Sequence, residues 1–178
     1  MVTTLINKPE PLIAIGVDPA LRKDGFWACE INREAQTATF VGFAHLGYFV
    51  AYLNEIKKRM IITVENSNEQ KNLFEKMQHT GIAGAISVGK NMGVSQAATD
   101  IANTYSLIES SISPEQKGPK ITDEKMFLSL VKSEGLTLIN YKGLKTEQDK
   151  RDAFKLALIS ERRYKMEQSV MAVRHKDE

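Results

Sequence analysis

The sequence predicts a mixed α/β domain with a five-stranded sheet, its first three strands antiparallel, flanked by helices. Two short runs, residues 12–17 and 60–64, are almost wholly apolar, which is typical of strands buried on both faces of a sheet. Strand-like segments follow one another up to residue 43, and strands and helices alternate after it. This order indicates one α/β domain, which we expect to span residues 1–178.

The first strand is expected over residues 12–17 and is expected to end at Asp18, because Pro19 lacks the amide hydrogen that a ladder needs. A turn near Gly25 should return the chain antiparallel to this strand. The remaining strands are expected at residues 26–31, 37–43, 60–64 and 136–139.

Helical spacing of apolar residues predicts the helices. They are expected at residues 45–59, in a short segment that carries Leu73, Phe74 and Met77, at 88–112, from Thr122, and from Thr146 to about residue 164. Apart from its apolar stripe, the helix over 88–112 is rich in Gly, Ala and Ser. The stretch 113–120 should break it, and Thr122 and Thr146 are the expected N-caps of the last two helices.

Composition excludes several classes of protein. No run of about 18 apolar residues could span a membrane, and the first residues lack the basic region and apolar core of a signal peptide. We therefore expect a cytoplasmic protein that does not bind a membrane. Cys29 is the only cysteine, which excludes an internal disulfide and a cysteine zinc site, and the three histidines are not at ligand spacing.

The net charge is only +2, but the positive charge is concentrated near the end of the chain. Residues 142–165 hold eight basic and four acidic side chains, a net charge of +4. A basic surface around a few carboxylates would suit a polyanionic ligand. A solvated helix face with mixed charges is the alternative.

Four acidic side chains stand where a charge is costly. Asp18 and Glu65 each follow a buried strand directly, and Asp149 and Asp152 lie three residues apart on one face of the last helix. An unpaired buried charge is costly, so such acids usually have a cation nearby, and Mg²⁺ prefers carboxylate oxygens. A nuclease can use two such ions about 3.5–4 Å apart to cut a phosphodiester. Four carboxylates from two strands and one helix could build that site.

Each acid also has an ordinary structural explanation. Asp18 could open an Asp-Pro turn, Glu65 could cap a following helix, and Asp149 and Asp152 suit a helix N-terminus. For any one of them alone the structural explanation is favoured. Their joint placement favours a metal site.

The order of these motifs resembles the RuvC-type Holliday-junction resolvases of the ribonuclease-H-like superfamily. Family members begin with a strand that ends in Asp-Pro-Gly, followed by a basic residue, a Gly and an aromatic, and residues 16–26 are similar, with Ala20 in place of the Gly. The second family acid resembles Glu65, and the small-residue helix of the family resembles residues 89–108.

Two further motifs extend the resemblance over nearly the whole chain, from about residue 13 to 159. The Pro and Lys that precede the next family helix resemble Pro114 and Lys117, and the closing Asp-x-x-Asp-Ala motif resembles residues 149–153. The chain departs from the family at residues 66–68, where Asn, Ser and Asn stand in place of a stacking aromatic.

The resemblance implies a ribonuclease-H-like fold and a function in DNA recombination and repair. It implies that the metal ligands and catalytic acids are Asp18, Glu65, Asp149 and Asp152. They would hold two Mg²⁺ ions, with Mn²⁺ as a substitute. The protein would be a homodimer, in contact through the small-residue helix, that cuts two opposed strands of a four-way junction to leave 5′-phosphate and 3′-hydroxyl ends. A branch-migration helicase is a candidate partner.

Junction DNA presents closely spaced phosphates, which basic side chains can contact. The candidate contacts are Lys90, Lys117, Lys120, Arg151 and Lys155. The family position favours Lys117 as a contact, whereas the other four are equally well explained as solvated side chains.

The sequence also bears on three other functions. A sugar kinase or actin-like ATPase would need small hydroxyl and Gly residues after the first strand, and residues 19–21 (Pro, Ala, Leu) do not supply them. A catalytically silent junction-binding protein would be indicated by loss of one of the acids, but all four are present. A related nuclease that acts on flaps or branched phage DNA remains an alternative.

Overall fold

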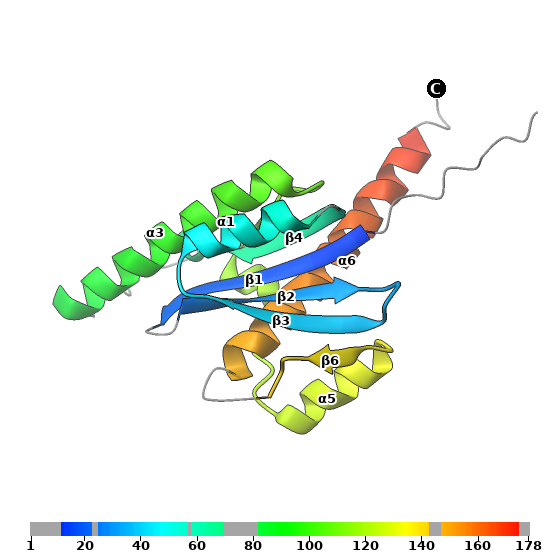
Figure 1. Ribbon diagram of the computed structural model, residues 1–178. Helices are drawn as coiled ribbons and strands as arrows, with labels where there is room; N and C mark the ends of the chain where they lie inside the picture. The colour runs from blue at the N-terminus through cyan, green and yellow to red at the C-terminus, as the bar shows by residue number, and fades with distance from the viewer. Residues whose placement is uncertain (1–11, 23–24, 57, 70–81, 143–146, 175–178) are drawn as a thin grey trace, which may run out of the picture.

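Strand β1 (Leu12–Arg22) lies inside a six-stranded sheet with the strand order β5-β4-β1-β2-β3-β6 (Figure 1). The computed structural model describes residues 12–22, 25–56, 58–69, 82–142 and 147–174. The other strands are β2 (Gly25–Asn32), β3 (Thr37–Phe43), β4 (Arg59–Glu65), β5 (Ser111–Ile112) and β6 (Thr137–Ile139). The helices are α1 (Leu46–Glu55), the 3-10 helix η1 (Ser67–Glu69), α3 (Ile82–Tyr105), α4 (Pro114–Lys117), α5 (Glu124–Ser133) and α6 (Glu147–Arg174).

The predicted mixed α/β class and the antiparallel β1-β2-β3 meander are confirmed. Strands β4, β5 and β6 pair in parallel with β1, β4 and β3, respectively. The predicted count of five strands is wrong, because β5 adds a sixth within the segment that was expected to end the long helix. The Ser110 carbonyl accepts a hydrogen bond from the Val64 amide of β4, and the Ile112 carbonyl accepts one from the amide of Asn66, which directly follows β4. Two residues of pairing are too few to give a periodic pattern.

Strand β1 continues past Pro19, where the sequence predicted its end. Parallel pairing with β4 does stop at Val17, but antiparallel pairing with β2 resumes at Arg22, which lies opposite Gly25. The register is irregular between Asp18 and Arg22, so the proline falls where the ladder is already interrupted and its missing amide hydrogen costs no regular bond.

Several helix boundaries also differ from the prediction. Helix α1 ends at Glu55, and β4 starts at Arg59. Helix α3 begins at Ile82 rather than at residue 88, and it ends at Tyr105. Helix α5 is capped by Asp123 rather than Thr122, because the Asp123 carboxylate accepts a 2.8 Å bond from the Met126 amide.

The remaining differences concern the last third of the chain. The predicted break at 113–120 contains the short helix α4, and α6 extends to Arg174 rather than to residue 164. The expected helix with Leu73, Phe74 and Met77 and the expected Thr146 cap lie outside the described residues. Among the described helices, none is long and apolar enough to cross a membrane.

Helices cover both faces of the sheet, as the apolar β1 and β4 predicted (Figure 1). On one face, α6 contributes Phe154 and Ala157 to a core that includes Ala14 of β1. On the other face, α1 and α3 pack on the alternate β1 residues. That second core includes Ile13, Ile15, Val17, Phe49, Leu53, Ala98 and Ala102. Even-numbered residues of β1 therefore face α6.

The contact of α6 with β1 is made at backbone distance. A Cβ atom built on Gly16 would lie 2.1 Å from the Ala153 carbonyl oxygen and 2.2 Å from the Ala157 amide nitrogen. The Ser160 hydroxyl adds a 3.1 Å hydrogen bond to the carbonyl of Ile15. A glycine at residue 16 is therefore required for this position of the helix.

Replacement of Gly16 by alanine should destabilise the protein by about 1–3 kcal/mol or more, because the obstructing atoms belong to the backbone of α6 and cannot move aside alone. Urea unfolding measures the change. The control is Gly89→Ala on α3, where the added Cβ meets nothing within 4 Å and should stabilise by roughly 0.5–1 kcal/mol. Equal stability of Gly16→Ala and the wild type would contradict the packing described here.

Candidate active site

Asp18 and Glu65 lie side by side at one edge of the sheet. Val17 of β1 pairs with Val64 of β4 in parallel register, so the next residue of each strand is an acid. Neighbouring strands are about 4.8 Å apart, which places the two acids next to each other. Because Asp18 is an even-numbered residue of β1, it is on the face that α6 covers.

Helix α6 brings the other two predicted acids to the same place. Asp149 and Asp152 lie in its first two turns and are buried. Ala153, the residue after Asp152, contacts Gly16 of β1, two residues before Asp18. The close packing of α6 on β1 therefore sets the position of Asp152 relative to Asp18. Gln148 further orients Asp152 by donating a 3.0 Å hydrogen bond to its Oδ1.

A lysine lies among these carboxylates. Lys117, the last residue of α4, is buried, and its Nζ pairs with Oε2 of Glu65 and lies 3.4 Å from Oδ2 of Asp152. Lys120 approaches the same Asp152 oxygen at 3.6 Å, but 57% of its side chain is exposed, compared with 4% for Lys117. Lys117 is thus enclosed by the acids, and Lys120 lies at their rim.

The charges of the other three acids act on Asp18. Burial raises the pKa of Asp18 to about 7, Lys117 opposes this shift, and the negative charges of Glu65, Asp152 and Asp149 add to it. Burial alone would lower the pKa of Lys117, but its carboxylate neighbours outweigh burial and raise it above the usual value. The acids therefore form one electrostatic cluster, in which Lys117 is a permanent cation.

The donor chemistry of this cluster fits a hard divalent ion. Four carboxylates from β1, β4 and α6 supply oxygen ligands of the kind that Mg²⁺ and Mn²⁺ take. Within the described part of the chain, however, no three Asp, Glu, His or Cys side chains are arranged to hold a metal ion together. The positive charge between Glu65 and Asp152 is the Lys117 ammonium.

The five basic residues predicted to contact DNA lie in different surroundings. Lys117 and Lys120 lie at the acids, and Lys155 donates a 2.6 Å bond to the Pro119 carbonyl beside them. Arg151 is buried, with its guanidinium bonded to Tyr141 and Gln148. Lys90 is exposed on the amino-terminal half of α3. Whether these side chains contact DNA stays a prediction.

Only part of the basic segment identified from the sequence, residues 142–165, lies on the protein surface. Lys150 is buried and donates hydrogen bonds to the carbonyls of Asn140 and Tyr141, and its Nζ lies 4.3 Å from the ring centroid of Trp27. With Lys150 and Arg151 both buried, part of the positive charge fixes the start of α6 to its surroundings.

A polar network that the sequence did not reveal fixes the segment after Glu65. Buried Asn66 donates to Glu69 and Ser111, and Asn68 donates to the Met92 carbonyl and to Gln96 of α3. Except for Glu69, these partners are far from Asn66 and Asn68 in the sequence, which shows only a polar connection at this point. The network ties the end of β4 to α3 and so holds the backbone of Glu65.

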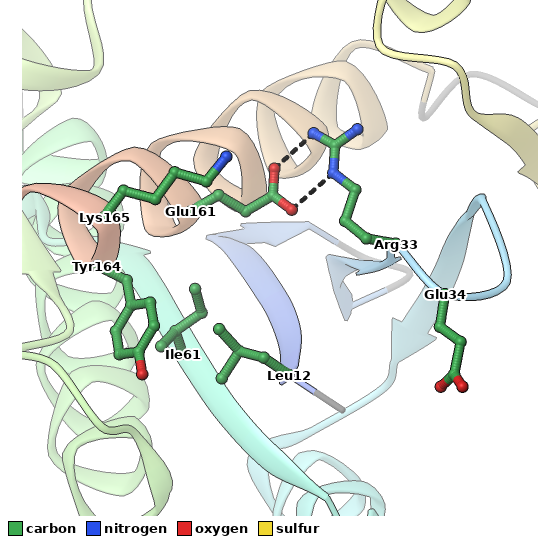
Figure 2. Close-up of a pocket in the computed structure, with 7 residues that line it drawn as sticks. All are labelled: Leu12, Arg33, Glu34, Ile61, Glu161, Tyr164 and Lys165. Carbon is green, nitrogen blue, oxygen red and sulfur yellow. Dashed lines mark hydrogen bonds and ion pairs between the residues drawn. The ribbon is translucent and has the colours of Figure 1, made fainter. Parts of the chain in front are cut away.

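The hollow shown in Figure 2 is not part of this cluster. It has a volume of about 290 Å³, with Leu12 and Ile61 at its base and an Arg33–Glu161 ion pair at its side. Leu12 begins β1, so this hollow is at the opposite end of the strand from Asp18. None of the four acids lines it.

No family model, curated protein or solved structure matches this chain. The function of the acidic cluster is therefore inferred from its chemistry.

In metal-free protein, Asp18 should make stability depend on pH. Its pKa in the folded state, about 7, is above the ordinary 3.8, so the folded state favours the protonated form. The free energy of unfolding should therefore fall as pH rises from about 4 to about 7 and then level off. Asp18→Asn should remove this component and be more stable than the wild type at pH 8 by a few kcal/mol.

Urea unfolding in chelator between pH 4 and 8 measures this difference. Glu109→Gln is the control, because it also removes one carboxylate charge but Glu109 is not one of the four acids and its side chain is 78% exposed. A wild type that is more stable than Asp18→Asn at pH 8 without metal would show that Asp18 is not a destabilising buried charge.

Proposed function

We propose that the protein is a metal-dependent endonuclease that resolves Holliday junctions in DNA by paired phosphodiester cleavage. The observation that carries the proposal is that the charges of Glu65, Asp149 and Asp152, from β4 and α6, all act on the buried Asp18 of β1. The mixed sheet with its antiparallel first strands is consistent with a ribonuclease-H-like domain, although it has six strands.

The four acids would hold the metal ions, and their burial would keep bulk water away from the reacting phosphate. Bound Mg²⁺, or Mn²⁺ in its place, would supply a water of lowered pKa and positive charge for the leaving oxygen. The charge of Asp18 is disfavoured by burial and by three other acids, so a bound cation would stabilise it.

The lysines at the rim would position the substrate. Lys120 is exposed beside Asp152, and Lys155 holds the Pro119 carbonyl next to it, so a phosphate that reaches the acids meets positive charge on arrival. Such contacts fix the DNA backbone without reading its sequence. This agrees with a substrate that is selected by its branched shape.

Paired cutting of opposed strands needs two active sites, so we propose a homodimer whose contact includes α3. In Figure 1 the amino-terminal part of α3 extends beyond the sheet. Ile82 and Ile86 are exposed there, and their spacing places them on one face of the helix.

Cleavage of a synthetic four-way junction tests the reaction. With Mg²⁺ the junction should be cut in preference to duplex, flap and single strand, and chelator should abolish cutting. Asp18→Asn and Asp152→Asn should lower the rate by roughly 100-fold or more, as loss of a group that acts on the reacting atoms does, whereas Glu109→Gln should not. Equal cutting of plain duplex would contradict the resolvase proposal, and a preference for flaps would favour a flap nuclease.

The dimer is tested separately by light scattering of the full chain. The wild type should elute as a dimer, and Ile86→Glu should shift it to a monomer and turn paired cuts into single nicks, because a charge is placed in an apolar contact. Met166→Glu is the matched control, since Met166 is also an exposed apolar residue but lies on α6. A wild type that is monomeric with junction bound would refute the dimer.

A further inference from the structure

Lys117 differs from the other basic residues at the site in being enclosed by acids rather than exposed beside them. Its ammonium pairs with Glu65 and lies 3.4 Å from Asp152, and the charge of Asp18 also acts on it. These are three of the four carboxylates that would hold a divalent ion. The same oxygens therefore serve as partners of Lys117 and as ligands of the metal.

The local structure fixes Lys117 in this place. Helix α4 opens with a capping box in which Ser113 and Gln116 bond to each other's backbone, and the Lys117 amide donates to the Ser113 carbonyl. Gly118 ends the helix with a φ of 73°. Lys155 then holds the Pro119 carbonyl. The backbone around Lys117 is thus bonded on both sides, whereas the side chain can change its partner without disturbing these bonds.

We propose that Lys117 is a built-in counter-ion that competes with divalent cations for Glu65 and Asp152, so that metal loading displaces its ammonium from Glu65. This inference rests on the proposed metal-dependent function. Without metal, the single positive charge of Lys117 keeps the acids together. A divalent ion would replace it with two positive charges. The displaced ammonium then needs a new anionic partner, and a DNA phosphate beside Lys120 would provide it. Metal and DNA should therefore bind cooperatively.

The test is the affinity of Mn²⁺ for the full chain without DNA, measured by titration calorimetry. Lys117→Met keeps an unbranched side chain, one heavy atom shorter, and removes its charge, so it should bind Mn²⁺ about 5- to 150-fold more tightly than the wild type. In chelator it should be less stable than the wild type, and Mn²⁺ should restore the loss. Lys120→Met is the matched control, because its exposed charge faces the same Asp152 oxygen and should change the affinity far less.

Unchanged or weaker Mn²⁺ binding by Lys117→Met would overturn the inference, while leaving the nuclease proposal standing if the wild type binds the ion. Absence of Mn²⁺ binding by both proteins would overturn the inference and the metal-dependent function together. Because Lys117→Met could fail to fold in chelator, the wild type provides a second measurement. Its Lys117 ¹⁵Nζ resonance should shift when Mg²⁺ is added, and an unchanged resonance at saturating Mg²⁺ would also refute displacement.

Discussion

The backbone contact between α6 and β1 at Gly16 is the constraint on which the rest of the structure depends. It lets the helix lie against the strand with no side chain between them, and the residues next to this contact are the acids. On β1, Asp18 lies two residues after Gly16 and therefore on the same face of the sheet. On α6, Asp152 directly precedes Ala153. A larger residue at position 16 would move α6 away from β1. It would thereby separate the acids of the helix from those of the strands without touching any of them.

The acids bear an energetic cost that the fold offsets in particular ways. Burial removes the hydration of Asp18 and the neighbouring carboxylates repel its charge, and both effects raise its pKa. Lys117 offsets part of the repulsion, and Gln148 and the network after Glu65 fix the geometry with hydrogen bonds from amide side chains to carboxylates. Large stabilising contacts elsewhere, such as the two apolar cores, must supply the remainder. A protein gains nothing in stability from such a cluster, so its presence favours a role in binding or chemistry.

The sequence predicted the central strands well because their signals are local. The apolar runs of β1 and β4, and the acid that ends each, can be read from a few adjacent residues. Strand β5 and helix α4 could not be predicted, since two and four residues are too short to show a period. The enclosure of Lys117 and the burial of Arg151 could not be predicted either. Both depend on partners or packing that only the folded chain brings together, such as Glu65 for Lys117.

The wide separation of the acids along the chain also bears on when the site can exist. Asp18 and Glu65 are synthesised early, but Asp149 and Asp152 belong to the last helix. Contacts between residues so far apart form late in folding because they require closure of long loops. The cluster is therefore completed only when α6 docks on β1. A nascent chain that stops short of α6 carries half of the acids and no complete cluster, so any chemistry of the cluster must wait until α6 has been synthesised.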